Sequence, residues 1–134
     1  MVRELTEVTC ALIRQDGRTL AVQRSEHMPH PLKWEFPGGK IMTGESPEKC
    51  IKREIREELG VEIRVEALLP TVVHTYGDRM IRLIPFICSL VSGEIHLTEH
   101  TAWTWMSDPE LEQADLLEAD RRLLSKLHRG GSAA

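Results

Sequence analysis

The sequence predicts a single α/β domain built around a mixed β-sheet. Apolar, β-branched segments that read as strands stand on both sides of an amphipathic helix with clear start and stop signals. The 134 residues are the size of one domain and contain no repeats or low-complexity segments, so we expect residues 1–134 to fold as one unit. A chain of this length buries a core without help from disulfides.

A β-hairpin is expected near the start of the chain. Residues 8–13 are apolar and rich in β-branched side chains, Asp16-Gly17 is a tight-turn pair, and residues 19–23 supply the partner strand. Pro29 and Pro31 then make residues 25–33 an irregular loop.

The next segment is expected to be short and extended, over residues 34–36. Pro37-Gly38-Gly39 should end this regular structure, and residues 40–45 read as a second, glycine-bearing loop.

A helix follows, with signals at both ends. Ser46 is a good N-cap, Pro47 is favoured at the first helical position, and Gly60 provides the stop. The apolar side chains that share one face of this helix are Cys50, Ile51, Ile55 and Leu59.

The C-terminal half is expected to contain further strands and a final helical region. The strands are expected over residues 61–75, 80–91 and 101–105. Gly77-Asp78 joins the first two, and Gly93 ends the second. The chain turns helical after Ser107-Asp108-Pro109, and residues 130–134 are expected to be a frayed tail.

The balance of charges argues against a nucleic-acid polymer as partner. The chain has 17 basic and 21 acidic side chains and a net charge of −4, whereas proteins that wrap DNA or RNA usually present a basic surface. An acidic chain that handles a polyanion needs cations to mediate the contact.

The cysteines favour a reducing compartment. Cys10, Cys50 and Cys88 are an odd number without a CxxC pair, which argues against a disulfide framework and a zinc site. No secretory signal or 18-residue apolar run is present. We therefore expect a soluble, cytoplasmic protein that has no membrane partner.

Three carboxylates are expected on one face of the helix, because Glu54, Glu57 and Glu58 are spaced i, i+3 and i+4. Like charges this close repel unless a cation lies between them, and Mg²⁺ prefers such oxygen ligands. The alternative is a solvated, ion-paired helix face, since Arg53 stands four residues before Glu57.

A longer pattern favours the metal site. Gly39, Glu45 and residues 53–61 match G-x5-E-x7-R-E-U-x-E-E-x-G-U at every position, where U is aliphatic. Amino-acid usage predicts a chance match on the order of 10⁻⁸. This pattern is the Nudix box, and the sequence resembles the Nudix hydrolases.

The resemblance covers about residues 8–127 and points to the MutT-like branch, through Ala21 to Arg24, Glu35 to Lys40, and Trp105 to Ser107. It implies an α/β/α sandwich with a central mixed sheet. It also implies hydrolysis of a nucleoside diphosphate linked to another group, with Mg²⁺ or Mn²⁺ as cofactor.

The resemblance also assigns roles to residues of the box and its surroundings. Arg53 would orient the glutamates as part of the catalytic group, and Glu54 or Glu99 would take the proton from water. Glu94 is a weaker candidate than Glu99 for the loop carboxylate, which could also be a plain exposed charge. The metal ligands implied are the Gly38 carbonyl, Glu54, Glu57, Glu58 and Glu99.

The substrate implied is a nucleoside triphosphate, cleaved to a nucleoside monophosphate and pyrophosphate by attack at the β-phosphorus. Arg24, Gly39 and Lys40 are candidates for contacts with the substrate, although Arg24 and Lys40 could equally be surface cations. Such enzymes cleanse the nucleotide pool, a form of DNA repair. The partner is then a small nucleotide, and the protein is a monomer or homodimer.

Asp120 is the candidate base-reading residue. It stands where MutT-like enzymes carry an asparagine, and an ionised aspartate only accepts hydrogen bonds. Leu117-Glu118-Ala119-Asp120 also resembles CTP pyrophosphohydrolases, so 8-oxo-dGTP is the first candidate and CTP or 5-methyl-dCTP the alternative. Asp120 could instead be an N-cap or a surface charge of the last helix.

Aromatic side chains could stack on the base. Phe36 and Tyr76 are the candidates, with Trp34 beside them, and each could equally belong to the core. The histidines that we expect to be structural are His74, His96 and His100, whereas His27 and His30 precede the box and could touch substrate.

Two competing readings remain. The box could serve a nucleotide sugar or dinucleoside polyphosphate, although the chain has no insertion for a larger substrate. A binding module that had lost catalysis would lack a box carboxylate, and none is lost here.

Overall fold

The structure is a computed structural model that describes residues 4–131, with side chains described through residue 128. Its elements, in chain order, are β1 (Glu4–Gln15), β2 (Arg18–Gln23), β3 (Trp34–Glu35), β4 (Gly38–Lys40), α1 (Pro47–Leu59), β5 (Glu62–Leu68), β6 (Val72–Tyr76), β7 (Arg79–Ser92), β8 (Ala102–Met106), α2 (Asp108–Gln113) and α3 (Glu118–Gly131). The helices found are too short or too polar to cross a membrane, among the residues that are described.

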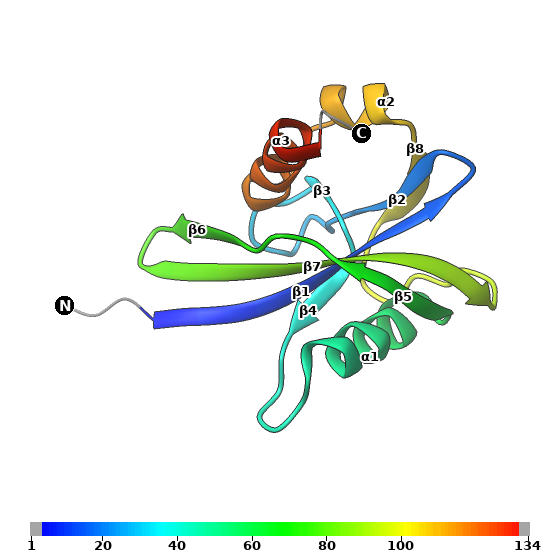
Figure 1. Cartoon of the computed structure of the whole chain (residues 1–134), viewed down its shortest axis with the longest axis horizontal. Helices are drawn as coiled ribbons and strands as arrows, with labels where there is room; N and C mark the ends of the chain where they lie inside the picture. The colour runs from blue at the N-terminus through cyan, green and yellow to red at the C-terminus, as the bar shows by residue number, and fades with distance from the viewer. Residues whose placement is uncertain (1–3, 132–134) are drawn as a thin grey trace.

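The sheet is mixed, as the sequence predicts. β1 and β7 run parallel, with residues 4–13 paired to residues 79–88, and the other pairings are antiparallel. α1 covers one face, while α2 and α3 cover the other (Figure 1). This arrangement is an α/β/α sandwich, so the predicted fold class is confirmed.

Each face of the sheet has its own buried core. The core on the α1 side includes Ile51, Ile55 and Leu59, which are fully buried against side chains from β1 and β2. The opposite core packs Leu123 of α3 with Phe36. Burying a large aliphatic or aromatic side chain contributes about 1.5–3 kcal/mol, so these two layers hold the helices on the sheet.

The predicted ends of α1 are confirmed. The Ser46 side chain accepts a hydrogen bond from the Lys49 backbone N–H, and Pro47 occupies the first turn. Gly60 ends the helix in the left-handed conformation, with φ of 69°, which glycine adopts without a steric penalty. These caps fix where the glutamate face begins and ends.

The segment after Pro37 is a strand and not the break that we expected. Residues 38–40 form β4, which pairs antiparallel with residues 8–10 of β1. A Cβ at Gly38 would lie 2.0 Å from the Thr9 carbonyl oxygen. The glycine thus permits a close approach between the two strands instead of ending regular structure.

The strand expected over residues 61–75 is two strands. β5 and β6 pair with successive parts of β7 and are separated around Pro70. Proline has no N–H to donate, so it interrupts the ladder.

The last helical region is likewise divided. α2 has a capping box between Ser107 and Glu110, and it ends before α3 begins at Glu118. α3 continues to Gly131, into the tail that we expected to be frayed, and residues 132–134 lie outside the described part.

Other local expectations are confirmed. β1 and β2 form the hairpin across residues 16–17. β8 lies within one residue of the last expected strand. The cysteines Cys10, Cys50 and Cys88 are free and buried.

Candidate active site

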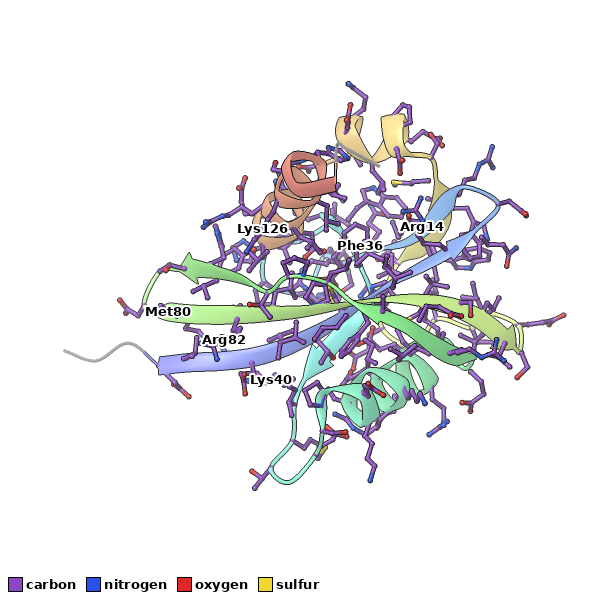
Figure 2. The ribbon with its side chains drawn as sticks, in the orientation of Figure 1. Arg14, Phe36, Lys40, Met80, Arg82 and Lys126 are labelled. Carbon is purple, nitrogen blue, oxygen red and sulfur yellow. The ribbon has the colours of Figure 1, made fainter. Side chains whose placement is uncertain are left out.

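A pocket of about 810 Å³ opens between the loop after β2, the strand β4, the C-terminal end of α1 and the turn after β6. Predicted site residues from five separate segments line it, namely Arg24, Gly38, Gly39, Lys40, Glu58, Tyr76 and Glu99. Lys40 lies where β4 leads into the loop before α1 (Figure 2). The sheet therefore brings these residues to a single cavity.

Arg53 organises the glutamates of α1. Its Nε and Nη2 donate to the two carboxylate oxygens of Glu45, at 2.6 and 3.0 Å. Its Nη1 donates to Glu54 at 2.8 Å and to Glu57 at 3.1 Å. The guanidinium thus holds Glu54 and does not line the pocket. Its role in catalysis stays a prediction.

The same ion pair shifts the titration of Glu45. The hydrogen bond from Arg53 is the main cause that lowers the pKa of Glu45 to about 2. The carboxylates around Arg53 in turn raise the pKa of the guanidinium, which stays charged.

Glu54 lies against β4 at a point where glycine leaves room for its carboxylate. A Cβ at Gly39 would lie 2.4 Å from the carboxyl carbon of Glu54. Gly39 thus leaves room for the Glu54 carboxylate beside the backbone of β4, where the neighbouring Gly38 lines the pocket.

Glu58 is the most perturbed acid of the box. Burial is the main cause that raises its pKa to about 9, followed by the neighbouring carboxylates of Glu54, Glu35 and Glu99. Its Oε2 atom is buried without a hydrogen-bond partner in the described part of the chain, and so is Nδ1 of His100. These two atoms are 3.8 Å apart.

The donor set fits a hard divalent cation. Carboxylate oxygens are the ligands that Mg²⁺ and Mn²⁺ prefer, and an acidic cluster around a buried carboxyl is relieved by positive charge. Within residues 4–131 no group of three acidic, histidine or cysteine side chains forms a ready-made metal cage. Glu57, whose side chain is 58% exposed, turns toward Arg53.

Glu99 and Arg24 lie at the pocket as predicted. Glu99 lies close enough to Glu58 to raise its pKa, whereas Glu94 does not line the pocket. Arg24 donates to Glu35 at 3.0 Å and to the Pro29 carbonyl at 2.8 Å. Its guanidinium is therefore held in place by the loop.

Asp120 is buried within the first turn of α3, which begins at Glu118, so it is neither an N-cap nor a surface charge. Only 3% of the residue is exposed, and its Oδ2 accepts a 2.7 Å hydrogen bond from the Phe36 backbone N–H. Burial first, and then the charge of Glu35, raise its pKa well above the usual range. Asp120 lines a small cavity of about 70 Å³ that shares Glu35, Gly38 and Tyr76 with the main pocket.

The aromatic candidates divide between core and pocket. Phe36 is buried and belongs to the core between the sheet and α3 (Figure 2), although it also lines the small cavity. Tyr76 lines both cavities, and its hydroxyl accepts a hydrogen bond from Ala119 N–H at 2.8 Å. Trp34 lies on a separate groove. His30 joins Tyr76 at the pocket, with 4.9 Å between ring centroids.

Sequence reasoning missed Glu35 and His100. The His100 side chain is 6% exposed, and its Nε2 lies 2.9 Å from Glu35 Oε2, although the residues are 65 positions apart. His100 lines the pocket, whereas we expected an ordinary structural histidine. In the sequence, the only indication that His100 lies at the pocket is that it follows Glu99.

Comparisons with known proteins agree with this geometry. The NUDIX domain model matches residues 4–127. The chain is 35% identical to a CTP pyrophosphohydrolase of Escherichia coli (strain K12) over 121 residues, or 90% of each chain. It is 31% identical to the 8-oxo-dGTP diphosphatase of the same organism, covering 92% of this chain and 96% of that one.

A solved structure shares the fold as well. The crystal structure of a MutT NUDIX hydrolase from Burkholderia pseudomallei has a TM-score of 0.82 and 30% identity, and the match covers 91% of this chain and 97% of that one. A family model that spans nearly the whole chain, together with these relatives, shows that the protein belongs to the MutT-like branch of the Nudix hydrolase family.

Proposed function

We propose that the protein is a divalent-metal-dependent pyrophosphohydrolase that converts a nucleoside triphosphate and water to a nucleoside monophosphate and pyrophosphate. The observation that carries the proposal is Glu58, a buried carboxyl that faces other carboxylates at the edge of an open pocket. An acidic pocket repels a triphosphate unless cations lie between them, so this site suits an anionic substrate only together with a metal.

The proposed cofactor is Mg²⁺ or Mn²⁺. The residues that would hold it are Glu54, Glu57, Glu58, Glu99 and the carbonyl of Gly38. When bound, such an ion neutralises phosphate oxygens and lowers the pKa of bound water.

The residues of the chain have distinct tasks in this proposal. Arg53 keeps Glu54 in one orientation through the 2.8 Å hydrogen bond. Glu54 or Glu99 accepts the proton of the attacking water. Arg24 and Lys40 line the same pocket and would neutralise phosphate charge that remains.

Asp120 supports 8-oxo-dGTP as the first candidate substrate. Its raised pKa favours the protonated carboxyl, which donates and accepts a hydrogen bond, as an asparagine amide does. A protonated Asp120 could therefore serve both the carbonyl and the N–H groups of an oxidised guanine.

The alternative substrate is CTP or 5-methyl-dCTP. An ionised Asp120 would accept from the exocyclic amine of cytosine. One relative is named a CTP pyrophosphohydrolase and another an 8-oxo-dGTP diphosphatase, at similar identity, so the names support both substrates.

A substrate panel tests the proposal. Release of the nucleoside monophosphate, and of pyrophosphate from the triphosphates, is measured with 8-oxo-dGTP, dGTP, CTP, 5-methyl-dCTP and ADP-ribose, each with Mg²⁺ and with a chelator. We expect release from a triphosphate only with the metal, and the highest kcat/KM for 8-oxo-dGTP. That preference would indicate a role in nucleotide-pool sanitation. Preference for ADP-ribose would contradict it.

A further inference from the structure

Four side chains form a continuous row across the pocket, from the loop after β2 to the end of α1. Arg24 Nη1 donates to Glu35 Oε1 at 3.0 Å, and Glu35 Oε2 lies 2.9 Å from His100 Nε2. His100 Nδ1 lies 3.8 Å from Glu58 Oε2. Glu35 therefore contacts a cation on one side and the imidazole on the other.

These contacts fix the orientation of the imidazole. Both oxygens of Glu35 are engaged, so its carboxylate is not free to rotate away from the ring. The His100 side chain is 6% exposed, which leaves the ring little space to turn. With Nε2 held by Glu35, Nδ1 is aimed at Glu58.

The contact between His100 and Glu58 is incomplete. Nδ1 of His100 and Oε2 of Glu58 are both buried, and neither has a hydrogen-bond partner among residues 4–128. Leaving buried polar atoms unpaired costs free energy, and such atoms are rare in folded proteins, so each pair calls for a reason such as a catalytic role or a bound ion. Packing alone does not explain why the His100 ring faces the Glu58 carboxylate at the pocket.

We propose that His100 is a positioning residue that sets the orientation of the Glu58 carboxylate for the metal. The inference rests on the metal-dependent hydrolysis proposed above, in which Glu58 is a ligand. The ring occupies one side of the carboxylate and limits its rotation, so that Glu58 meets a cation in one orientation. Glu35 affects Glu58 only indirectly, because it holds the His100 ring in place.

A metal-binding measurement without nucleotide tests this role directly. Mn²⁺ is titrated into the intact protein, and free Mn²⁺ is followed by electron paramagnetic resonance. His100→Gln keeps an amide that can reach Glu35 and removes the group that faces Glu58. We expect its Mn²⁺ dissociation constant to rise about 10-fold, the usual scale for losing a group that orients a metal ligand. His96→Gln, an exposed histidine of the same loop, is the matched control and should bind like the wild type.

Turnover gives a second readout. We expect kcat of His100→Gln to fall while the nucleotide KM stays within about 2-fold, because the substrate contacts are intact. Circular dichroism checks the fold, and if His100→Gln does not fold, His100→Leu, which likewise has no polar group facing Glu58, carries the same expectation. Mn²⁺ affinity equal to the wild type in a folded variant would overturn the positioning role while leaving the hydrolase proposal standing. If the wild type neither binds Mn²⁺ nor releases pyrophosphate, the proposed function itself fails.

Discussion

Arg53 donates two hydrogen bonds to Glu45, of 2.6 and 3.0 Å, and so connects the loop before α1 to the helix. The same guanidinium also donates to the Lys40 carbonyl at 3.2 Å. One side chain thus joins the end of β4, the loop and the glutamate face. The position of Glu54 depends on this junction.

The first prediction concerns acid stability. The pKa of Glu45 is lowered from its ordinary value near 4.5 to about 2, so the ion pair contributes stability above pH 4.5. That contribution is lost as pH falls from 4.5 toward 2. Glu45→Gln should therefore lower the thermal midpoint at pH 7, and the difference from the wild type should shrink below pH 4.5. Glu48→Gln, an exposed acid at the start of the same helix, is the control. A difference that does not change with pH would be the contrary result.

The second prediction concerns the buried acid Asp120. The pKa of Asp120 is higher in the folded protein than its ordinary value of 3.8. Its contribution to the free energy of unfolding is therefore greatest below pH 3.8 and declines as pH rises toward the folded-state pKa. Asp120→Asn has no charge to bury and can still accept from Phe36 N–H. Its midpoint relative to the wild type should increase as pH rises above 3.8. A relative midpoint that decreases over this range would show that the carboxylate is stabilised when charged.

A third prediction concerns base recognition. Asp120→Ala should weaken the discrimination between bases because it removes the polar side chain that lines the small cavity. Pyrophosphate should remain the product, since the metal-binding residues are untouched. The check is the ratio of kcat/KM values over the substrate panel. An unchanged ranking would mean that Asp120 does not read the base.

The fourth prediction tests the glycine beside Glu54. In Gly39→Ala the new Cβ would meet the Glu54 carboxyl at 2.4 Å, so this side chain must move. We expect kcat/KM to fall by at least about 10-fold, since small displacements of a catalytic group are costly. Met42→Ala, at an exposed position in the following loop, should leave activity unchanged. If Gly39→Ala is folded and fully active, the orientation of Glu54 does not limit the reaction.

Local signals account for what the sequence predicted. Ser46, Pro47 and Gly60 specify α1 through caps that act within a few residues, and the turn pair Asp16-Gly17 specifies the first hairpin. The i, i+3, i+4 spacing alone did not choose between a metal site and a solvated face. The longer Nudix pattern made that choice.

Long-range contacts account for what the sequence did not predict. Glu35 and His100 meet only after β3 and β8 have both joined β2 in the sheet. The strand character of residues 38–40 depends likewise on β1 lying alongside. Burial of Asp120 depends on α3 docking over Phe36, a contact between residues 84 positions apart. No local pattern carries such information.

The central claim is that the carboxylates of α1 act through a bound metal, and Glu57 tests it most directly. The Glu57 side chain is 58% exposed, and within the described residues its carboxylate has a hydrogen bond only with Arg53. If its role were structural alone, replacing the carboxylate would therefore change stability and activity very little. The measurement is the Mg²⁺-dependent turnover of Glu57→Gln, with exposed Glu48→Gln of the same helix as control. We predict a loss of at least about 10²-fold for Glu57→Gln and none for the control, because a metal ligand has been removed. Near-normal turnover of Glu57→Gln would contradict the account.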